Sequence, residues 1–506
     1  MTQLVRAEAD DGAPMPPTPA SARHVRRRRA ASLLWTLLES GSLTALSLLT
    51  LIVFARLLTP AELGSAALGL SIVQILGMPV IALFQDALVQ RRDAAPGHFD
   101  TAFTVSLALG AVLAALCWAE AERISALVQD PAAGTALRWM SLCLPLQALE
   151  SVLIARQRRE LRFRDLALCT VLGRLCAGLA AIVIALAGGG IWAPIAQQVL
   201  SVLLSAGVLY WSVAERIGFR FDPRAFRELF HFGIRELGTN GLVVAIPRIF
   251  LMQVAFMLGT EAAGYANLAF RMVDTLRDVL VTAIWRLSLP VFSRLGHARR
   301  LLRRALTGAI EDTSAMVFPL FAGLAAVTPE LVATVFGPAW SPALPYMLAL
   351  SAVALLFLVR IHLWVALTAL GHPHYPIPGL LLEAAVILAW PPLAPFSALA
   401  APLAWVVRAA LALPVDAWML RRASGIPIAA QFEGLAVLLF ASLAMAGGVV
   451  ALGAVLPGGM PAWLRLALLM ASGAVLYGAL IMLIRPGLVR RLLAFARQAN
   501  RHAAAR

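Results

Sequence analysis

Charged residues are scarce in this chain of 506 amino acids, and lysine is absent from it. Asp, Glu, Lys and Arg together make up 14% of the residues, whereas a soluble globular protein carries about 25%. Hydrophobic residues account for 60%, and the mean hydropathy is +0.82. So few charged residues cannot cover the solvent-exposed surface of a soluble fold of this length. The composition therefore excludes a soluble protein and indicates an integral membrane protein.

The sequence also lacks the motifs of several enzyme classes. Its four cysteines lie within or beside apolar runs and form no CxxC pair, which favours small helix residues over a metal or redox site. No phosphate-binding glycine loop, nucleophile elbow or zinc-binding helix occurs. The pair His372 and His374 lacks the further ligands that a metal needs. We therefore expect a protein that is not an enzyme and that has no cofactor and no metal site.

Long runs of apolar residues make up most of the sequence. Because backbone groups in lipid must be bonded within their own segment, runs of this length are helices and not strands. The expected fold is an all-α polytopic membrane protein with about 14 transmembrane helices. The candidate spans are residues 32–54, 65–88, 102–119, 137–155, 166–187, 191–213, 237–258, 265–290, 307–327, 343–368, 377–394, 397–418, 435–456 and 462–484.

The 42 basic residues, all of them arginine, are distributed in step with these spans. Alternate loops and the two tails hold 31 of them, the opposite loops hold only Arg56 and Arg123, and nine lie inside spans. By the positive-inside rule this asymmetry places both termini in the cytoplasm. The opposite loops are no longer than about 17 residues, which leaves no room for an outer catalytic or binding domain. We expect a multi-pass protein of the bacterial inner (cytoplasmic) membrane.

An internal repeat is indicated by matches at a constant shift of 200 residues. Leu58, Gly64 and Ala66 follow the first span, and Leu258, Gly264 and Ala266 follow the seventh. A parallel duplication of six helices explains this spacing. The expected organisation is a disordered basic tail (1–29), a six-helix bundle (30–213), a cytoplasmic linker (214–236), a second six-helix bundle (237–420), helices 13 and 14 (421–484) and a basic cytoplasmic tail (485–506).

Several segments resemble those of a known family. They are Ala55–Gly64, Leu88–Asp93, Gly264–Arg271, Leu289–Leu295 and Phe336–Trp340. Over roughly residues 30–422 the chain resembles the polysaccharide transporter family, the O-antigen and exopolysaccharide lipid-linked oligosaccharide flippases. That family belongs to the multidrug, oligosaccharidyl-lipid and polysaccharide exporter superfamily.

The resemblance implies two six-helix bundles in a V shape around a central cavity. It also implies a flippase for polysaccharide biosynthesis, of lipopolysaccharide or exopolysaccharide, that works by alternating access. Its substrate would be an undecaprenyl-diphosphate-linked oligosaccharide repeat unit, moved from the cytoplasmic to the periplasmic leaflet. Expected partners are a polysaccharide polymerase and chain-length proteins, and no nucleic acid.

Span 265–290 carries the richest set of polar residues. Asn267, Arg271, Asp274, Asp278, Thr282 and Arg286 follow one another at steps of four or three, so they share one helical stripe. A charge at the bilayer centre costs about 2.5–3.5 kcal/mol, so the stripe faces water or protein. Arginine suits a diphosphate because its planar fork donates paired hydrogen bonds and stays protonated. The predicted cavity residues are Arg174, Arg248, Arg271, Asp274, Arg277, Asp278, Arg286 and Gln74.

Two alternatives stay open for these charges. The spacings of Arg271 with Asp274, and of Arg277 with either aspartate, also fit ion pairs within the helix, which would neutralise the charges without a ligand. Of the further arginines, Arg360 and Arg408 inside spans could snorkel to an interface, and Arg138 and Arg465 lie near span ends, where an interfacial position is expected. For energy coupling, Glu39, Glu150 and Glu383 are candidates to bind H+ or Na+, although Glu39 is equally suited to a hydrogen bond between helices.

Two other functions are compatible with so many spans. A multidrug or organic-cation exporter of the same superfamily predicts an acidic or aromatic cavity, whereas the embedded arginines outnumber the clear acidic sites. A membrane polymerase or glycosyltransferase requires a sizeable outer loop or an acidic pair at the membrane face, and the short outer loops argue against it.

Overall fold

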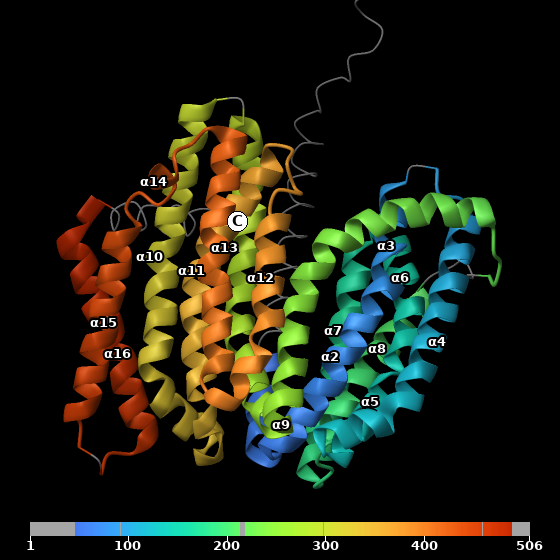
Figure 1. Cartoon of the computed structure of the whole chain (residues 1–506), viewed down its shortest axis with the longest axis horizontal. Coiled ribbons are helices and arrows are strands. Elements are labelled where there is room, and N and C mark those ends of the chain that lie inside the picture. The colour runs from blue at the N-terminus through green and yellow to red at the C-terminus, as the bar shows by residue number, and fades with distance from the viewer. Residues whose placement is uncertain are drawn as a thin grey trace, which may run out of the picture.

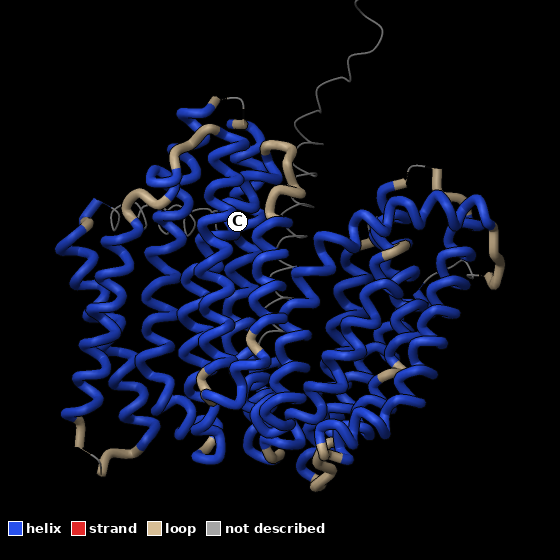
Figure 2. Tube along the Cα trace, in the orientation of Figure 1, coloured by secondary structure: helices blue, strands red, loops and turns tan. Residues whose placement is uncertain are grey.

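The computed structural model describes residues 46–91, 93–160, 162–212, 218–296, 298–457 and 459–487, and helices make up most of this part of the chain (Figure 2). No strand occurs among the described residues. Eleven helices there are long and apolar enough to cross a membrane. One of the eleven, Gly241–Leu295, has 55 residues, and two shorter apolar helices, Leu46–Leu57 and Ile377–Ala389, accompany them. The all-α polytopic fold is confirmed, and the expected 14 spans are consistent with this count.

The helices fall into two groups in space (Figure 1). The first group contains α2 (Pro60–Ala82), α3 (Gln85–Gln90), α4 (Pro96–Val128), α5 (Pro131–Met140), α6 (Cys143–Arg159), α7 (Phe163–Leu186) and α8 (Trp192–Ser212). The second contains α10 (Arg299–Leu331), η1 (Val332–Phe336), η2 (Pro338–Ala343), α11 (Leu344–Ala369), α12 (Ile377–Ala389), η3 (Pro391–Phe396), α13 (Ala400–Ser424), α14 (Ile428–Gln431), α15 (Leu435–Val455) and α16 (Ala462–Ile484). Both groups meet α9 (Pro223–Leu295), which runs between them.

Local sequence explains where several helices begin. Thr59 and Glu62 form a capping box at the start of α2, with the Glu62 carboxylate accepting from the Thr59 amide at 2.8 Å. Asp130 and Asp222 cap α5 and α9 by accepting amide hydrogen bonds of 2.9 Å. In all three helices the first residue is proline, whose missing N–H costs nothing at that position. These starts fix the ends of the spans.

A break at Gly259 divides α9 into two arms. Gly259 has φ 89° and ψ 165°, a conformation that only glycine adopts without strain. The break lies 200 residues after Thr59, the N-cap of α2, so the second arm and α2 begin at matched positions of the repeat. The shift of 200 found in the sequence therefore recurs as a correspondence between two helices.

Helix α2 packs more extensively against α9 than any other pair of elements does. A Cβ atom at Gly64 would overlap the carbonyl oxygen of Thr260, and one at Gly264 would overlap that of Pro60. The two contacts are reciprocal at the shift of 200, as in an interface around a two-fold axis. Glycine at both positions lets the two backbones touch. In Figure 1 this contact lies at the lower end, and the two groups diverge toward the upper end, where α3 and α14 lie.

Helices α15 and α16 pack mainly against α10 and each other. The Tyr477 hydroxyl donates to the Ala315 carbonyl at 2.8 Å, and Arg465 pairs with Glu330 at 3.4 Å. These two helices form the outer edge of the second group in Figure 1. They thus extend the second group beyond α10.

Candidate functional site

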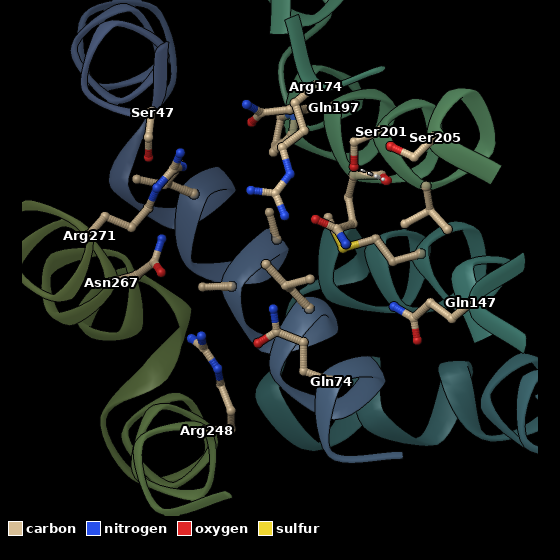
Figure 3. Close-up of a pocket in the computed structure, with 18 of the residues that line it drawn as sticks. Ser47, Gln74, Gln147, Arg174, Gln197, Ser201, Ser205, Arg248, Asn267 and Arg271 are labelled. Atoms are coloured by element: carbon tan, nitrogen blue, oxygen red, sulfur yellow. Dashed lines mark hydrogen bonds between the residues drawn. The ribbon is translucent and has the colours of Figure 1, made fainter. Parts of the chain in front are cut away.

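A cavity of about 470 Å³ lies where the first group of helices faces α9. Its lining contains three arginines, four glutamines, one asparagine, three serines and a single carboxylate, Glu150. Figure 3 shows the polar groups pointing into a common space from α9, α2, α7 and α8. The polar lining residues are Ser47, Gln74, Gln147, Glu150, Arg174, Gln197, Gln198, Ser201, Ser205, Arg248, Asn267 and Arg271.

The three arginines reach the cavity from opposite sides. Arg174 belongs to α7, whereas Arg248 and Arg271 come from the two arms of α9, before and after Gly259. None of the three forms an ion pair with a carboxylate among the described residues. Glu150 and Arg174 interact electrostatically without forming such a pair. The Nε atom of Arg248 is buried without a hydrogen-bond partner there. The cavity therefore has an excess of positive charge and unused donors.

Unused acceptors accompany these donors. The Oε1 atoms of Gln74 and Gln147 are buried and have no hydrogen-bond partner among the described residues. Such atoms are rare in folded proteins because each costs about 1–3 kcal/mol when left unpaired. A Cβ at Gly77 would lie 2.6 Å from Oε1 of Gln147, so glycine leaves space for this amide. A ligand that both donates and accepts hydrogen bonds suits this lining.

One polar stripe of the cavity was missed by the sequence analysis. Gln197, Ser201 and Ser205 line it from α8 at steps of four residues. Their spacing is the same signal that identified the stripe of span 265–290. A search for uncharged polar residues at steps of three or four would have identified these three residues. Gly173 on α7 allows the close approach, because a Cβ there would lie 2.7 Å from the Ser205 hydroxyl.

The stripe predicted on span 265–290 divides in two. Asn267 and Arg271 line the cavity. Arg277 instead pairs with Asp274 at 2.8 Å and with Asp278 at 3.1 Å, as the spacing allowed. Arg286 is exposed and lines no cavity described here. Of the predicted cavity residues, the structure brings together Gln74, Arg174, Arg248 and Arg271.

A buried network of charges lies in the second group of helices. Arg360 of α11 bonds Asp416 of α13 through Nε and Oδ2 at 2.7 Å, and its Nη1 bonds Glu383 of α12. The second oxygen of Glu383 accepts from Arg408 of α13, whose guanidinium lies 3.4 Å from the centre of the Trp405 ring.

These four groups, hereafter the charge quartet (Arg360, Glu383, Arg408 and Asp416), are all buried and sum to zero charge. Arg360 and Arg408 do not snorkel, which corrects that alternative for them, because their carboxylate partners lie within the bundle. Asp416 was not singled out in the sequence. Glu383 and Arg408 of the quartet line a cavity of about 70 Å³ together with Asp274 and Arg277.

The coupling candidates differ in their surroundings. Glu150 lines the cationic cavity, Glu383 belongs to the charge quartet, and Glu39 lies outside the described residues. Among the described residues no cluster of His, Cys, Asp or Glu is suited to hold a metal ion. His372 instead stacks on Tyr375, with ring centres 4.6 Å apart.

The rim of the first group is held by ion pairs outside the spans. Arg91 contacts Asp93 at 2.9 Å and Glu228 of α9 at 2.7 Å. The hydrogen bond from Arg91 lowers the pKa of the Asp93 carboxyl, and the two carboxylates raise the pKa of Arg91. The first turns of α9 are thus tied to the connection between α3 and α4.

Comparisons with known proteins agree with this architecture. The profile of a family described as "Polysaccharide biosynthesis protein" matches residues 53–345. The succinoglycan biosynthesis transport protein ExoT of Rhizobium meliloti (strain 1021) is 28% identical over 322 residues, which cover 63% of this chain and 65% of ExoT. The lipopolysaccharide biosynthesis protein WzxC of Escherichia coli (strain K12) is 21% identical, over 66% of this chain and 68% of WzxC.

Solved structures share the fold at low sequence identity. The lipid II flippase MurJ in an inward closed conformation has a TM-score of 0.72 at 12% identity, covering 90% of this chain and 100% of MurJ. An inward-facing multidrug resistance MATE family transporter of the MOP superfamily has a TM-score of 0.58 at 14% identity, covering 77% and 96%. The resemblance drawn from the sequence motifs is confirmed: this chain is a polytopic membrane protein that belongs to the polysaccharide biosynthesis protein family.

Proposed function

We propose that this protein is a flippase for oligosaccharides linked to a polyprenyl diphosphate, moving them from the cytoplasmic to the periplasmic leaflet. The observation that carries the proposal is the cavity with Arg174, Arg248 and Arg271, three guanidinium groups without carboxylate partners in the described structure. A diphosphate supplies the negative charge that they lack, and paired N–H···O bonds to phosphate are strong.

The rest of the lining suits a sugar. Amide and hydroxyl groups of Gln74, Gln147, Gln197 and Ser201 can donate to and accept from sugar hydroxyls. The polyprenyl tail is apolar and has no reason to leave the lipid. In this proposal the protein shelters only the polar part of the substrate, and the tail follows in the bilayer.

Translocation requires the cavity to open to one side at a time. On the side of the Gly64 and Gly264 contact, Arg56 donates to the Val335 carbonyl at 2.6 Å and also to that of Thr334. Trp340 donates to the Ala55 carbonyl at 2.7 Å. In the expected orientation these contacts close the periplasmic side. We propose that they break, and the opposite ends close, when the substrate crosses.

The cavity charge disfavours the export of organic cations. The lining has three arginines and one glutamate, so its net charge repels a cationic drug. This repulsion is strong at close range, where like charges are poorly screened. The shared fold with a multidrug transporter concerns the arrangement of helices and not the lining. For energy coupling we propose Glu150, the one carboxylate of the cavity lining. Both oxygens of Glu383 are already bonded to arginines.

The proposal is tested by replacing the cavity arginines. In a strain lacking the gene, Arg271→Ala and Arg174→Ala are expected to insert normally yet lower surface polysaccharide export at least about tenfold, since each removes charge-assisted hydrogen bonds of about 1.5–3 kcal/mol. Lipid-linked repeat units should accumulate in the cytoplasmic leaflet. Arg123→Ala is the matched control, because Arg123 is exposed and pairs only with Glu120 in the described structure.

Two results would contradict the proposal. Normal export by Arg174→Ala, Arg271→Ala and the double variant would show that the cavity arginines are not needed for export. Repeat units that reach the periplasmic leaflet but stay unpolymerised in the deletion strain would instead support the polymerase alternative.

A further inference from the structure

A second cavity, of about 650 Å³, lies away from the first, at one end of the second group of helices. It is formed by the first turns of α10, by the connection between α14 and α15, and by the residue after α16. In Figure 1 these elements meet near α14. The lining residues are Arg300, Arg303, Arg304, Thr307, Glu311, Glu433, Gly434 and Arg485.

The lining carries four arginines and two glutamates. Arg303 pairs with Glu433 at 3.0 Å, and Arg485 pairs with Glu311 at 3.1 Å. Arg300 and Arg304 have no carboxylate partner among the described residues and face the same cavity, one helical turn apart. The cavity therefore offers two guanidinium groups to an anion. The two ion pairs hold α10 close to the elements on either side of it.

The position of this cavity relative to the bilayer restricts what it can bind. The span of α10 begins at Arg299 and the span of α16 ends at Ile484, so the cavity lies at a membrane surface. This side carries the arginine-rich loops and is cytoplasmic in the expected orientation. Large apolar side chains flank the arginines along the chain, and Leu301, Met482 and Leu483 are 50%, 62% and 82% exposed. Exposed apolar side chains thus lie next to the basic residues along the chain.

We propose that this cavity binds the phosphate headgroup of an anionic glycerophospholipid of the cytoplasmic leaflet. Arg300 and Arg304 contact the phosphate, and the acyl chains lie on the exposed apolar side chains of α10 and α16. Basic pockets between helices at the cytoplasmic surface are suited to such headgroups. A soluble anion would gain nothing from the apolar flank. The bound lipid bridges α10 to α16 and so holds the last two helices on the second group.

Binding is tested on the full-length protein in detergent by native mass spectrometry with dioleoyl phosphatidylglycerol. Arg300→Gln with Arg304→Gln is expected to bind this lipid about thirtyfold more weakly than the unmodified protein, because two guanidinium contacts at an anionic surface are lost. Arg300→Lys with Arg304→Lys keeps both charges and is expected to retain most of the affinity for this lipid. This variant also controls for an effect of substitution on folding. Arg421→Gln with Arg422→Gln is the matched control, since both are exposed at the end of α13 on the same side.

The comparison of ligands decides between a lipid and a free anion. Dioleoyl phosphatidylcholine, which has no net charge, and glycerol phosphate, which has no acyl chains, are each expected to bind at least about tenfold more weakly than phosphatidylglycerol. Unchanged phosphatidylglycerol binding by the double glutamine variant would overturn the proposal. So would glycerol phosphate binding as tight as the lipid, because that would show a site for soluble phosphate.

Discussion

Arg271 and Arg277 lie six residues apart on one arm of α9, and their neighbours decide what each can bind. Arg277 pairs with Asp274 and Asp278, although its Nε atom has no hydrogen-bond partner among the described residues. Arg271 faces the cavity without a carboxylate partner in the described structure. A guanidinium that already has two carboxylates loses those bonds when it binds a phosphate, so the exchange yields little. In our proposal, free charge, and not charge alone, distinguishes the arginines that bind the substrate.

Glu150 offers a prediction at the scale of one residue. Glu150→Gln keeps the shape of the side chain but removes the proton exchange that we propose for coupling. The variant should then flip lipid-linked repeat units at the rate that the unmodified protein shows in de-energised cells. An ionophore that dissipates the proton gradient should not change the rate of the variant. Flipping is measured by the appearance of repeat units in the outer leaflet.

Glu120→Gln is the control for this substitution, because Glu120 is exposed and pairs with Arg123 outside the cavity. If Glu150→Gln responds to the ionophore as strongly as the unmodified protein does, Glu150 does not couple transport to protons.

Single residues also show what the sequence could predict. The embedded arginines were recognisable because charge inside an apolar run has few explanations, and three of them line the cavity. Which arginines are paired could not be predicted, since the partners of Arg360 lie 23 and 56 residues away on other helices. The polar groups of α8 escaped notice because Gln and Ser are tolerated in membrane helices at low cost.

At the scale of elements, the contact between α2 and α9 relates the two halves of the chain. Its reciprocal pattern, Gly64 on Thr260 and Gly264 on Pro60, requires that no side chain intervene. The repeat was visible in the sequence as matched Leu, Gly and Ala residues. That the matched glycines touch each other was not, because sequence similarity between two helices carries no information on whether they are neighbours.

A leucine at Gly64 is therefore expected to force α2 and α9 apart. Overpacking costs typically about 1–3 kcal/mol, and here the obstacle is backbone that cannot rotate away. Gly64→Leu should lower the thermal unfolding temperature in detergent by several degrees and reduce export. Gly207→Leu on α8 is the matched control, because a Cβ at Gly207 meets nothing within 4 Å. Equal unfolding temperatures for the two variants would show that the contact is not tight.

At the scale of the whole molecule, the two groups of helices are in contact at one end and diverge at the other (Figure 1). Among the described residues, few polar contacts hold the closed end. Arg56, in the helix Leu46–Leu57, donates to the Thr334 and Val335 carbonyls of the second group, and Trp340 of that group donates to the Ala55 carbonyl. The polar part of this closure can be opened by binding energies of ordinary size.

Arg56→Ala is expected to shift the protein toward a state open on that side. The loss of two charge-assisted hydrogen bonds, about 1.5–3 kcal/mol each, changes the ratio of the two states by at least about tenfold. The shift is measured with a cysteine at Ser201 in the cavity, in a background without the native cysteines. Labelling by a membrane-impermeant maleimide added outside the cell should be faster in the variant.

Arg123→Ala serves as the reference, because it removes an arginine from the same side without touching the second group of helices. Unchanged labelling of the Arg56 variant would indicate that the apolar contact and the glycine pair alone hold this end closed.

The charge quartet has a consequence for how the protein is made. During synthesis α11 emerges with Arg360 before Glu383 exists, and Asp416 follows 56 residues after Arg360. Each of α11 and α12 alone therefore brings an uncompensated charge toward the lipid, at about 2.5–3.5 kcal/mol on insertion scales. The charges of Arg360 and Glu383 cancel once α12 has been made, and α13 then supplies the second partner of each, Asp416 for Arg360 and Arg408 for Glu383. We therefore expect α11 and α12 to leave the insertion machinery together and α13 to join them afterwards, which makes the order of their synthesis part of the assembly of the second group.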